Sequence, residues 1–357
     1  MDAIGGDATP RHAAAALVRL AAELATRAGL EAEKAGVLAE VLVEADLLGH
    51  GTHGLALLPR YLDDIATGAM RREGEPEVVR DRGAAIAWRG LRLPGPWLVR
   101  RAIDLALDRA ATYGSCTVAI ADSHHIACLA AYLTQATDRG CMVVLSTSAP
   151  AAATVAPFGG RGGVLAPDPV AAGIPTDGDP ILIDISASIT TNNMAMRMAR
   201  EGRLYPHEWL IDAAGNPSRD PRVLDAGGAL LPAGGLDHGQ KGYGWALLTE
   251  ALTQGLSGFG RADAPKGLCG AVTVQVLDPD AFGGREAFLR QTSWTAAACR
   301  AAPPLPGVER VRLPGEAGLA HRRQALAAGV ALSPAILSGL EAAAAKLGLA
   351  MPAPLTD

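Results

Sequence analysis

The sequence predicts a mixed α/β (α+β) protein whose two ends together form a helical domain. Three observations indicate this fold class. Residues 10–68 carry apolar residues at helical spacing, the middle of the chain alternates apolar strands with helical segments, and residues 317–348 return to helical periodicity. We therefore expect a helical domain of residues 1–75 with 307–357, and a mixed α/β domain of residues 76–306.

The N-terminal helices have recognisable start and stop signals. Thr9-Pro10 predicts a helix start, because threonine is a good N-cap and proline fits the first helical position. This helix is expected to end before Gly29, where glycine readily adopts the conformation that terminates helices. We expect a second helix over residues 31–48 and a third over residues 57–66, before Gly68.

The middle of the chain alternates short apolar runs with helical segments, which is typical of a sheet covered by helices. The expected strands are short apolar runs, at residues 76–88, 117–122, 141–146, 181–185 and 271–277. Helical periodicity separates them, at residues 96–113, 129–139 and 241–256. Two closing helices are expected at residues 317–328 and at residues 334–348, where Ser333-Pro334 starts the second.

Composition excludes several classes of protein. The net charge is −5 with no basic stripe or polybasic block, which argues against a nucleic-acid surface and a membrane patch. No apolar run is long enough for a transmembrane helix, and the N-terminus lacks the pattern of a signal peptide. The five cysteines are widely spaced without a Cys-x-x-Cys pair, which indicates free thiols in a reducing cytoplasm and no zinc site.

The segment from Gly49 to Gly54 is the first candidate for chemistry. Its three glycines allow a sharp turn between two helices, and His53 would project from that turn beside Thr52. Histidine is the side chain best suited to exchange a proton near neutral pH. The alternative interpretation is a helix–helix turn whose histidines only form hydrogen bonds.

Nucleotide-binding and metal-binding fingerprints are absent from the sequence. Gly159–Gly163 does not have the Gly-x-Gly-x-x-Gly spacing of a Rossmann loop, and no Walker or His-Glu-x-x-His motif occurs. His124 and His125 are adjacent, so on a strand they would point to opposite faces and could not easily share a metal. No metal site is therefore expected.

Three further segments are candidates for ligand contacts. Asp184–Thr190 follows an apolar strand with small hydroxylated residues that suit a phosphate or ribose, although an ordinary polar strand end has the same pattern. Lys241-Gly242 opens a helix, where the lysine can meet a phosphate or remain solvated. Glu316 lies in a first helical turn, where it can also simply complement the helix dipole.

Eight short motifs then occur in a fixed order between about residues 10 and 350. They are Ala45–Gly54 followed by Leu58–Tyr61, Ser123–His125, Val155–Gly160 followed by Pro169 and Ile174–Thr176, Asp184–Ser188, Ile211–Pro217, Gly228–Pro232, Lys241–Gly244, and Pro314–Glu316. Together they resemble the type-2 malate/L-lactate dehydrogenase family. That family also includes ureidoglycolate, sulfolactate and diketogulonate dehydrogenases or reductases, and cyclic-imine reductases.

The resemblance implies a nicotinamide-binding domain that is not Rossmann-like, NAD or NADP as cofactor, a small-molecule substrate and a homodimer. It implies that His53 is the proton donor and acceptor, oriented by Thr52 and Asp184, with His125 as the rival acid/base. The implied cofactor contacts are Ser148, Asp184, Ile185, Ser186, Ser188, Lys241, Gly242, Gly315 and Glu316. The implied substrate contacts are Arg60 and Tyr61.

The sequence departs from the family pattern at the substrate end. Leu57 stands where many members have an arginine, which would hold a substrate carboxylate with two hydrogen bonds. Pro167-Asp168 replace the usual Thr-Asn, and Ile126-Ala127 replace an aromatic-Gly pair. Either another cation, Arg60 or Arg161, binds the acid, or the substrate is less anionic than a 2-hydroxy acid.

Three functions therefore remain open. The first is an NAD(P)-dependent oxidoreductase for a small 2-hydroxy/2-oxo acid or a related compound. The second is an NAD(P)H-dependent reductase of cyclic imino acids such as piperideine- or pyrroline-2-carboxylate. The third is a non-catalytic homologue that binds nucleotide. Joint presence of His53, Asp184 and Lys241 favours an enzyme.

Overall fold

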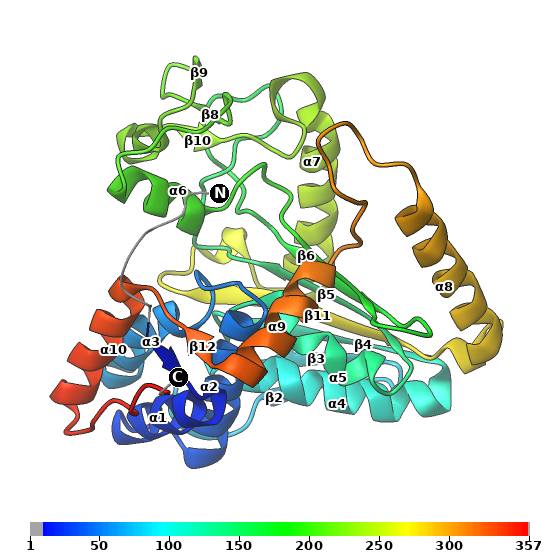
Figure 1. Ribbon diagram of the computed structural model, residues 1–357, viewed down its shortest axis with the longest axis horizontal. Helices are drawn as coiled ribbons and strands as arrows, with labels where there is room; N and C mark the ends of the chain where they lie inside the picture. Colours follow the sequence, from blue (N-terminus) through cyan, green and yellow to red (C-terminus); the bar gives the residue numbers. More distant parts are fainter. Residues whose placement is uncertain (1–9, 356–357) are drawn as a thin grey trace. The chain divides into compact units, whose positions relative to one another are not determined.

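The computed structural model describes residues 10–355, which divide into two compact units. The helical unit combines the residues up to Glu73 with those from Glu316 onwards, and the sheet unit is Gly74–Gly315 (Figure 1). The mixed α/β class predicted from the sequence is confirmed. The expected N-cap at Thr9 lies outside the described residues.

The helical unit is built on amphipathic helices whose apolar stripes pack together. Its helices are α1 (Ala14–Arg27), α2 (Ala32–Leu47), the 3₁₀ turn η1 (Leu55–Leu57), α3 (Leu58–Thr67), α9 (Glu316–Ala328) and α10 (Pro334–Lys346). Leu24, Leu38 and Leu42 are among the side chains with no exposed surface in this core. Burial of each such side chain contributes roughly 1.5–3 kcal/mol.

The first helix begins later than predicted. Arg11–His12 form a short strand, β1, which pairs antiparallel with β12 (Val330–Ala331). The chain is therefore extended where Pro10 was expected to open a helix, and α1 starts at Ala14. The helix start at Pro10 was wrongly predicted because the strand that pairs with Arg11–His12 lies more than three hundred residues away in the sequence.

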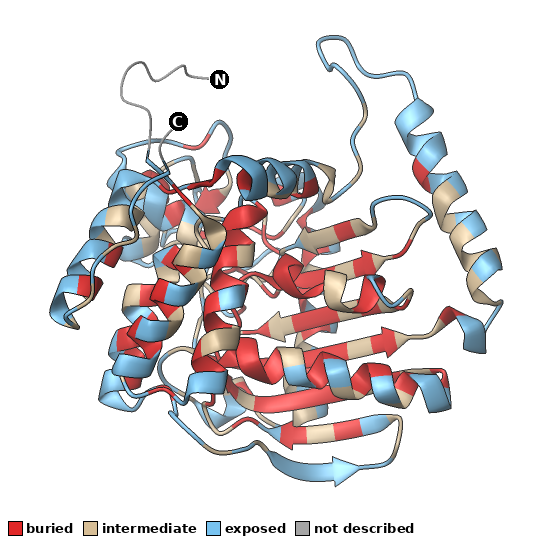
Figure 2. Cartoon of the chain, turned by 60° about the horizontal axis from the view of Figure 1, so that its bottom comes forward, coloured by how far each residue is buried: buried red, intermediate tan, exposed pale blue. Residues whose placement is uncertain are grey.

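The sheet unit contains a seven-stranded sheet in the order β2-β3-β4-β11-β5-β6-β7. Its strands are β2 (Glu77–Asp81), β3 (Ala85–Arg89), β4 (Ser115–His124), β5 (Met142–Ser148), β6 (Val170–Ile174), β7 (Ile181–Ile185) and β11 (Cys269–Leu277). β3 and β4 run parallel, and the other neighbouring pairs are antiparallel. Buried residues concentrate on the central strands and on the inner side of the helix that covers them (Figure 2).

Helices and a small second sheet complete this unit. The helices and helical turns are α4 (Gly95–Tyr113), η2 (Leu129–Tyr132), α5 (Thr134–Thr137), α6 (Asn192–Arg200), η3 (Pro221–Ala226), α7 (Gly235–Glu250), the π-helical turn η4 (Ala251–Gly255), η5 (Arg261–Asp263), η6 (Pro279–Ala281) and α8 (Arg285–Ala301). The small sheet has β8 (Leu210–Ile211) between β9 (Pro217–Ser218) and β10 (Ala229–Leu230). α4 packs on β4 and β11 and so buries one face of the large sheet.

Several middle elements differ from the sequence-based expectation. Residues 76–88 form a hairpin that turns at Gly83, which has a φ of +76°. The helix expected over residues 129–139 is a 3₁₀ turn followed by the four-residue α5. All five cysteines are free thiols, and four of them are buried. Among the described residues, no helix has the length and apolar character needed to cross a membrane.

Candidate functional site

A cavity in the sheet unit brings together four residues that the sequence predicted as cofactor contacts. Ile185 and Ser186 follow strand β7, and Lys241 and Gly242 lie on helix α7. The cavity has a volume of about 360 Å³, within the usual range for small-molecule sites. Its lining consists of Ile185, Ser186, Ala187, Ala233, Gly234, Lys241, Gly242 and Trp245.

The cavity exists because α7 lies directly against two extended segments. The N–H of Gly242 donates to the carbonyl of Ala233 at 3.1 Å, and the N–H of Ala233 donates to the carbonyl of Ala187 at 2.7 Å. A Cβ on Gly242 would lie 2.4 Å from the nitrogen of Ala233, far inside van der Waals contact. Gly242 is therefore required for this packing, whatever it contacts in a ligand.

The cavity walls are apolar, with one cation beside them. Ile185 is 51% exposed and Trp245 is 39% exposed, so both offer apolar surface to a ligand in the cavity. Lys241 lies four residues before Trp245 and so occupies the same side of α7. This combination suits a planar ring with an anionic group nearby.

The backbone amides around the cavity are already engaged. Those of Ala187, Ala233 and Gly242 each donate to a protein carbonyl, at 2.8, 2.7 and 3.1 Å. These three amides are therefore not free to bind a phosphate. Lys241 is consequently the group in the cavity lining that can neutralise a phosphate or carboxylate.

The predicted serine contacts are also engaged within the protein. The hydroxyl of Ser186 donates to the carbonyl of Ser188 at 2.8 Å, and that of Ser188 donates to the carbonyl of Thr190 at 2.6 Å. Ser148 is buried, and its hydroxyl donates to Glu250 Oε1 at 2.9 Å. These bonds fix local loops, and a cofactor contact by the three serines stays a prediction.

Gly315 and Glu316 end the sheet unit and begin the helical unit, respectively. Gly315 has a φ of +84°, and a Cβ there would lie 2.6 Å from the Cβ of Leu182. The neighbouring Pro314 carbonyl accepts the Leu182 N–H at 3.2 Å, so this segment is pinned to strand β7. Glu316 is the first residue of α9.

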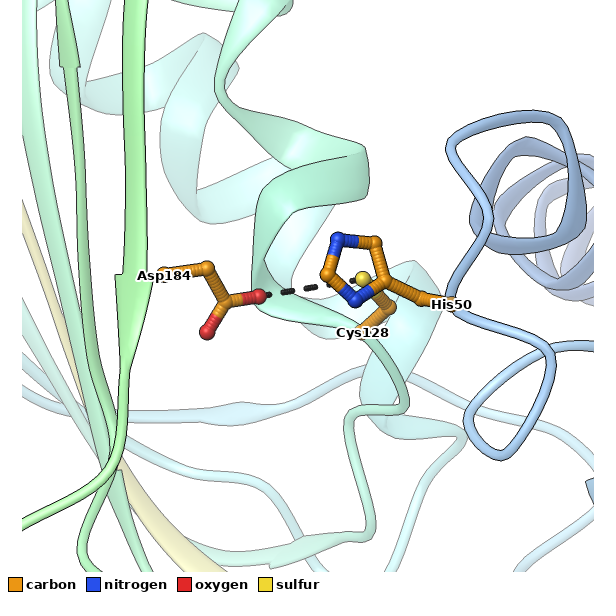
Figure 3. Close-up of side chains that lie close together, drawn as sticks. All are labelled: His50, Cys128 and Asp184. Carbon is orange, nitrogen blue, oxygen red and sulfur yellow. Dashed lines mark hydrogen bonds between the residues drawn. The ribbon is translucent and has the colours of Figure 1, made fainter. Parts of the chain in front are cut away.

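Asp184, on β7, is held by two donors from the η2 region. Its Oδ2 accepts the N–H of Ala130 at 2.9 Å and lies 3.8 Å from the Sγ of Cys128 (Figure 3). Burial raises the pKa of the Cys128 thiol, and the negative charge of Asp184 raises it further. Cys128 therefore remains a neutral thiol that donates to Asp184. Figure 3 also labels His50, which belongs to the helical unit.

His125 lies in a strained segment formed by the last residues of β4 and the loop that follows. Its Nδ1 accepts the N–H of Ala127 at 3.2 Å. Asp122 and Ala127, on either side of it, have φ angles of 49° and 60°, a conformation that costs about 1 kcal/mol or more for residues with a side chain. Arg92 stabilises the loop through a 2.5 Å ion pair with Asp122. Strain of this kind is typical of functional loops, and it supports keeping His125 as a candidate.

The helical unit carries the other histidine candidate. His53 is half-buried in the turn between α2 and η1, and its Nδ1 lies 3.0 Å from the hydroxyl of Thr52. Of the predicted substrate contacts, Tyr61 is completely buried, and Arg60 Nε pairs with Asp64 at 3.0 Å. Arg161, the other candidate cation, is exposed in a loop of the sheet unit.

Four residues of the cavity were not among the predicted contacts, namely Ala187, Ala233, Gly234 and Trp245, although Ala187 lies within the candidate segment Asp184–Thr190. Trp245 had a detectable signal, because it follows Lys241 at the i+4 spacing that places two side chains on one helix face. Ala233 and Gly234 had no such signal. They reach the cavity through tertiary packing against α7.

Comparison with known proteins gives consistent results. The family model for malate/L-lactate dehydrogenase matches residues 13–341. The chain is 32% identical to the L-lactate dehydrogenase of Cupriavidus necator, over 94% of this chain and 97% of that protein. It is also 32% identical to the delta(1)-pyrroline-2-carboxylate/delta(1)-piperideine-2-carboxylate reductase of Pseudomonas syringae pv. tomato, over 88% and 90% of the two chains. The malate dehydrogenase structure from Pyrococcus horikoshii superposes with a TM-score of 0.86 at 26% identity, covering 99% and 100% of the chains.

Proposed function

The chain belongs to the malate/L-lactate dehydrogenase family of oxidoreductases, and we propose that it transfers a hydride between NAD or NADP and a small 2-hydroxy/2-oxo acid or a related compound. The observation that carries the proposal is the cavity beside β7 and α7. Four residues expected to contact the cofactor line it together, from two segments more than fifty residues apart.

The cavity fits a nicotinamide nucleotide chemically. Ile185 and Trp245 supply apolar surface for a planar ring, and Lys241 supplies the charge for a phosphate. The surrounding sheet is largely antiparallel, and the sequence has no Rossmann fingerprint. Both observations support nucleotide binding by a domain that is not Rossmann-like.

The bound nicotinamide would supply or accept the hydride. The chain must supply or accept the accompanying proton at the oxygen or nitrogen of the substrate. An imidazole does this near neutral pH and contributes roughly 10²–10⁴-fold to the rate. We assign the role to His53, whose Nδ1 contact with Thr52 fixes the ring so that Nε2 can meet the substrate. His125 is the rival candidate.

A cyclic imino acid is the second candidate substrate. The relative from Pseudomonas syringae is named as a reductase of pyrroline- and piperideine-2-carboxylate. Leu57, where many family members have an arginine, does not distinguish the two candidates, because both substrates carry a carboxylate. The same hydride and proton geometry would serve both substrates.

We also propose that the protein forms a homodimer in the cytoplasm. An exposed arm, consisting of α8 and residues 302–313, supports the dimer. Among the residues of α8, Ala296 is the one buried side chain. The arm carries Trp294, which is 69% exposed, and Leu305, which is 75% exposed. Apolar side chains this exposed are typical of protein–protein interfaces.

The first test is nucleotide binding followed by turnover. NADH and NADPH are titrated against the protein, and consumption is then measured with a panel of 2-oxo acids and cyclic imines. We expect binding of at least one nucleotide and turnover with one substrate class. Binding without turnover across the panel would favour a non-catalytic homologue, and no binding of either nucleotide would refute the proposal.

Substitutions test which residue binds the nucleotide and which residue transfers the proton. Lys241→Ala should weaken nucleotide binding about tenfold or more, because a charge-assisted hydrogen bond is lost. Lys266→Ala, an exposed lysine of the same unit outside the cavity lining, is the control. His53→Ala should abolish turnover and preserve nucleotide binding. Near-normal turnover of His53→Ala would transfer the acid/base role to His125.

A further inference from the structure

We propose that Asp46 is a positioning residue that holds the turn carrying His53 in its working geometry. Asp46 lies in the last turn of α2, seven residues before His53. The inference deepens the function proposed above and rests on it, because it assigns a support to the candidate acid/base. The contacts that carry it lie within the helical unit.

The carboxylate of Asp46 fills the inside of the turn. Its Oδ2 accepts the N–H of Leu55 at 2.8 Å, so it ties the residue that follows the turn back to the helix that precedes it. Asp46 is 6% exposed, and the turn covers it. A hydrogen bond from a charged acceptor to a backbone amide is a strong local constraint.

One glycine of the turn, Gly54, packs directly against this carboxylate, and a second, Gly51, lies near it. A Cβ on Gly54 would lie 2.4 Å from Cγ of Asp46 and 2.5 Å from both of its oxygens. A Cβ on Gly51 would lie 3.6 Å from Oδ1. Gly54 has a φ of −99°, outside the left-handed region, and the carboxylate of Asp46 leaves no room for a side chain there.

The end of α2 is itself fixed and can serve as a reference point. The Nδ1 of His321, on α9, lies 2.8 Å from the carbonyl of Leu47, and Arg322 Nε pairs with Glu44 at 2.7 Å. Within the turn, the N–H of His53 donates to the carbonyl of His50 at 2.8 Å. A connected set of bonds therefore leads from α9 through α2 to the backbone of His53.

Burial at position 46 disfavours the charged form of a carboxylate. Burial raises the pKa of Asp46 to about 7, and the Leu55 N–H opposes that rise in part. The folded protein thus bears the cost of a nearly buried charge that a neutral side chain would avoid. Retention of such a group beneath a functional turn is typical of residues that secure site geometry.

Matched variants separate positioning from simple loss of stability. Asp46→Ala removes the hydrogen bond, Asp46→Asn keeps an oxygen for the Leu55 N–H, and Gly54→Ala displaces the carboxylate from the other side. Gly36→Ala is the control, because a Cβ at Gly36 of the same helix meets nothing within 4 Å. Each protein is first checked for cooperative thermal unfolding, and kcat, KM and nucleotide affinity are then measured.

We expect Asp46→Ala and Gly54→Ala to lower kcat by about 10- to 100-fold, the effect of a small misplacement of a reacting group. Nucleotide affinity should stay within about twofold of the wild-type value, because no nucleotide contact is removed. Asp46→Asn should recover most of kcat, and Gly36→Ala should match the wild type. Wild-type kcat in Asp46→Ala would overturn the proposal, as would equal losses of kcat and nucleotide affinity.

A spectroscopic readout keeps this test independent of the proposed reaction. The ring ¹H–¹³C signal of His53 is assigned by its absence in His53→Ala. It should shift in Asp46→Ala and Gly54→Ala and stay in place in Gly36→Ala. A stationary signal in Asp46→Ala refutes the positioning role. A shifted signal together with normal turnover of His53→Ala supports positioning by Asp46 and refutes the acid/base role of His53.

Discussion

Asp168 shows how a single residue can make the stability of this protein depend on pH. It lies between β5 and β6, is completely buried, and has a φ of 43°, which is rare for a residue with a side chain. Burial and, to a lesser extent, the neighbouring carboxylate of Glu250 raise its pKa to about 8, although Arg261 opposes both. Asparagine, which the family resemblance predicts at this position, would not titrate.

We predict that Asp168→Asn stabilises the protein progressively as pH rises from 5 to 9. The pKa of Asp168 is higher in the folded than in the unfolded protein, so the folded state holds the proton more tightly between about pH 4 and pH 8. Wild-type stability from this group is therefore present at low pH and lost as pH rises through that window. Asparagine does not titrate and avoids the loss.

The measurement is the difference in melting temperature between Asp168→Asn and the wild type at several pH values. Asp225→Asn, at an exposed position of the same unit, is the control and should show no such trend. A difference that stays constant from pH 5 to pH 9 would show that Asp168 is ionised throughout, contrary to this prediction.

The candidate site was predictable from the sequence where motif identity sufficed. Ile185, Ser186, Lys241 and Gly242 line one cavity, although nothing local in the sequence brings the two pairs together. Other features depend on side-chain contacts that form only in the tertiary structure. The engaged hydroxyl of Ser148 is one such feature, because it results from packing of the end of β5 against Glu250.

At the scale of elements, the packing of α7 controls the cavity, and Gly242→Ala tests this. The added Cβ would meet Ala187 and Ala233 at 2.4–2.6 Å and push the helix away from the segments that form the opposite wall. We expect nucleotide affinity to fall about tenfold and the melting temperature to fall by several degrees, as for other overpacked sites costing about 1–3 kcal/mol.

Gly244→Ala provides the control on the same helix. Gly244 is exposed, and a Cβ there meets nothing within 4 Å. Replacing a glycine by alanine inside a helix stabilises it by about 0.5–1 kcal/mol, so this variant should melt slightly higher and bind nucleotide normally. Equal nucleotide affinity in both variants would show that the contact of α7 with the two segments does not shape the cavity.

Elements with strong local periodicity were predicted well. β7 lies at the expected residues 181–185, and α4 differs from the expected residues 96–113 by one residue at its start. The structure also contains α8, which the sequence did not reveal. One face of α8 is half-buried, at Phe288, Leu289 and Thr292, but Ala296 is its one fully buried residue, so its apolar stripe is weak. The strands β8, β9 and β10 were missed because each has two residues, which is too short to show the alternating pattern of a strand.

At the scale of the whole molecule, the arm of α8 and residues 302–313 is the feature that a second copy of the chain would explain. It is anchored to its own unit at both ends, by an ion pair from Arg285 to Asp278 at one end and by the Pro314 carbonyl at the other. Thr292 also donates to the carbonyl of Pro175 at 2.7 Å. Most of α8 is exposed or half-exposed (Figure 2), and the large side chains of Trp294 and Leu305 are exposed. Exposure of this kind is unfavourable for an isolated chain, since each buried apolar Å² contributes about 25 cal/mol.

We therefore predict that Trp294→Glu, combined with Leu305→Glu, converts a dimer into a monomer at micromolar concentration. A charge placed in an apolar contact must lose its water, and loss of a buried aromatic anchor alone typically costs at least about 2 kcal/mol, or roughly thirtyfold in Kd. Sedimentation velocity over a range of concentrations gives the dissociation constant. Val78→Glu, at an equally exposed site on β2, is the control and should leave the dimer intact. A wild-type protein that is monomeric throughout, or a dimer that tolerates both glutamates, would remove the arm from the interface.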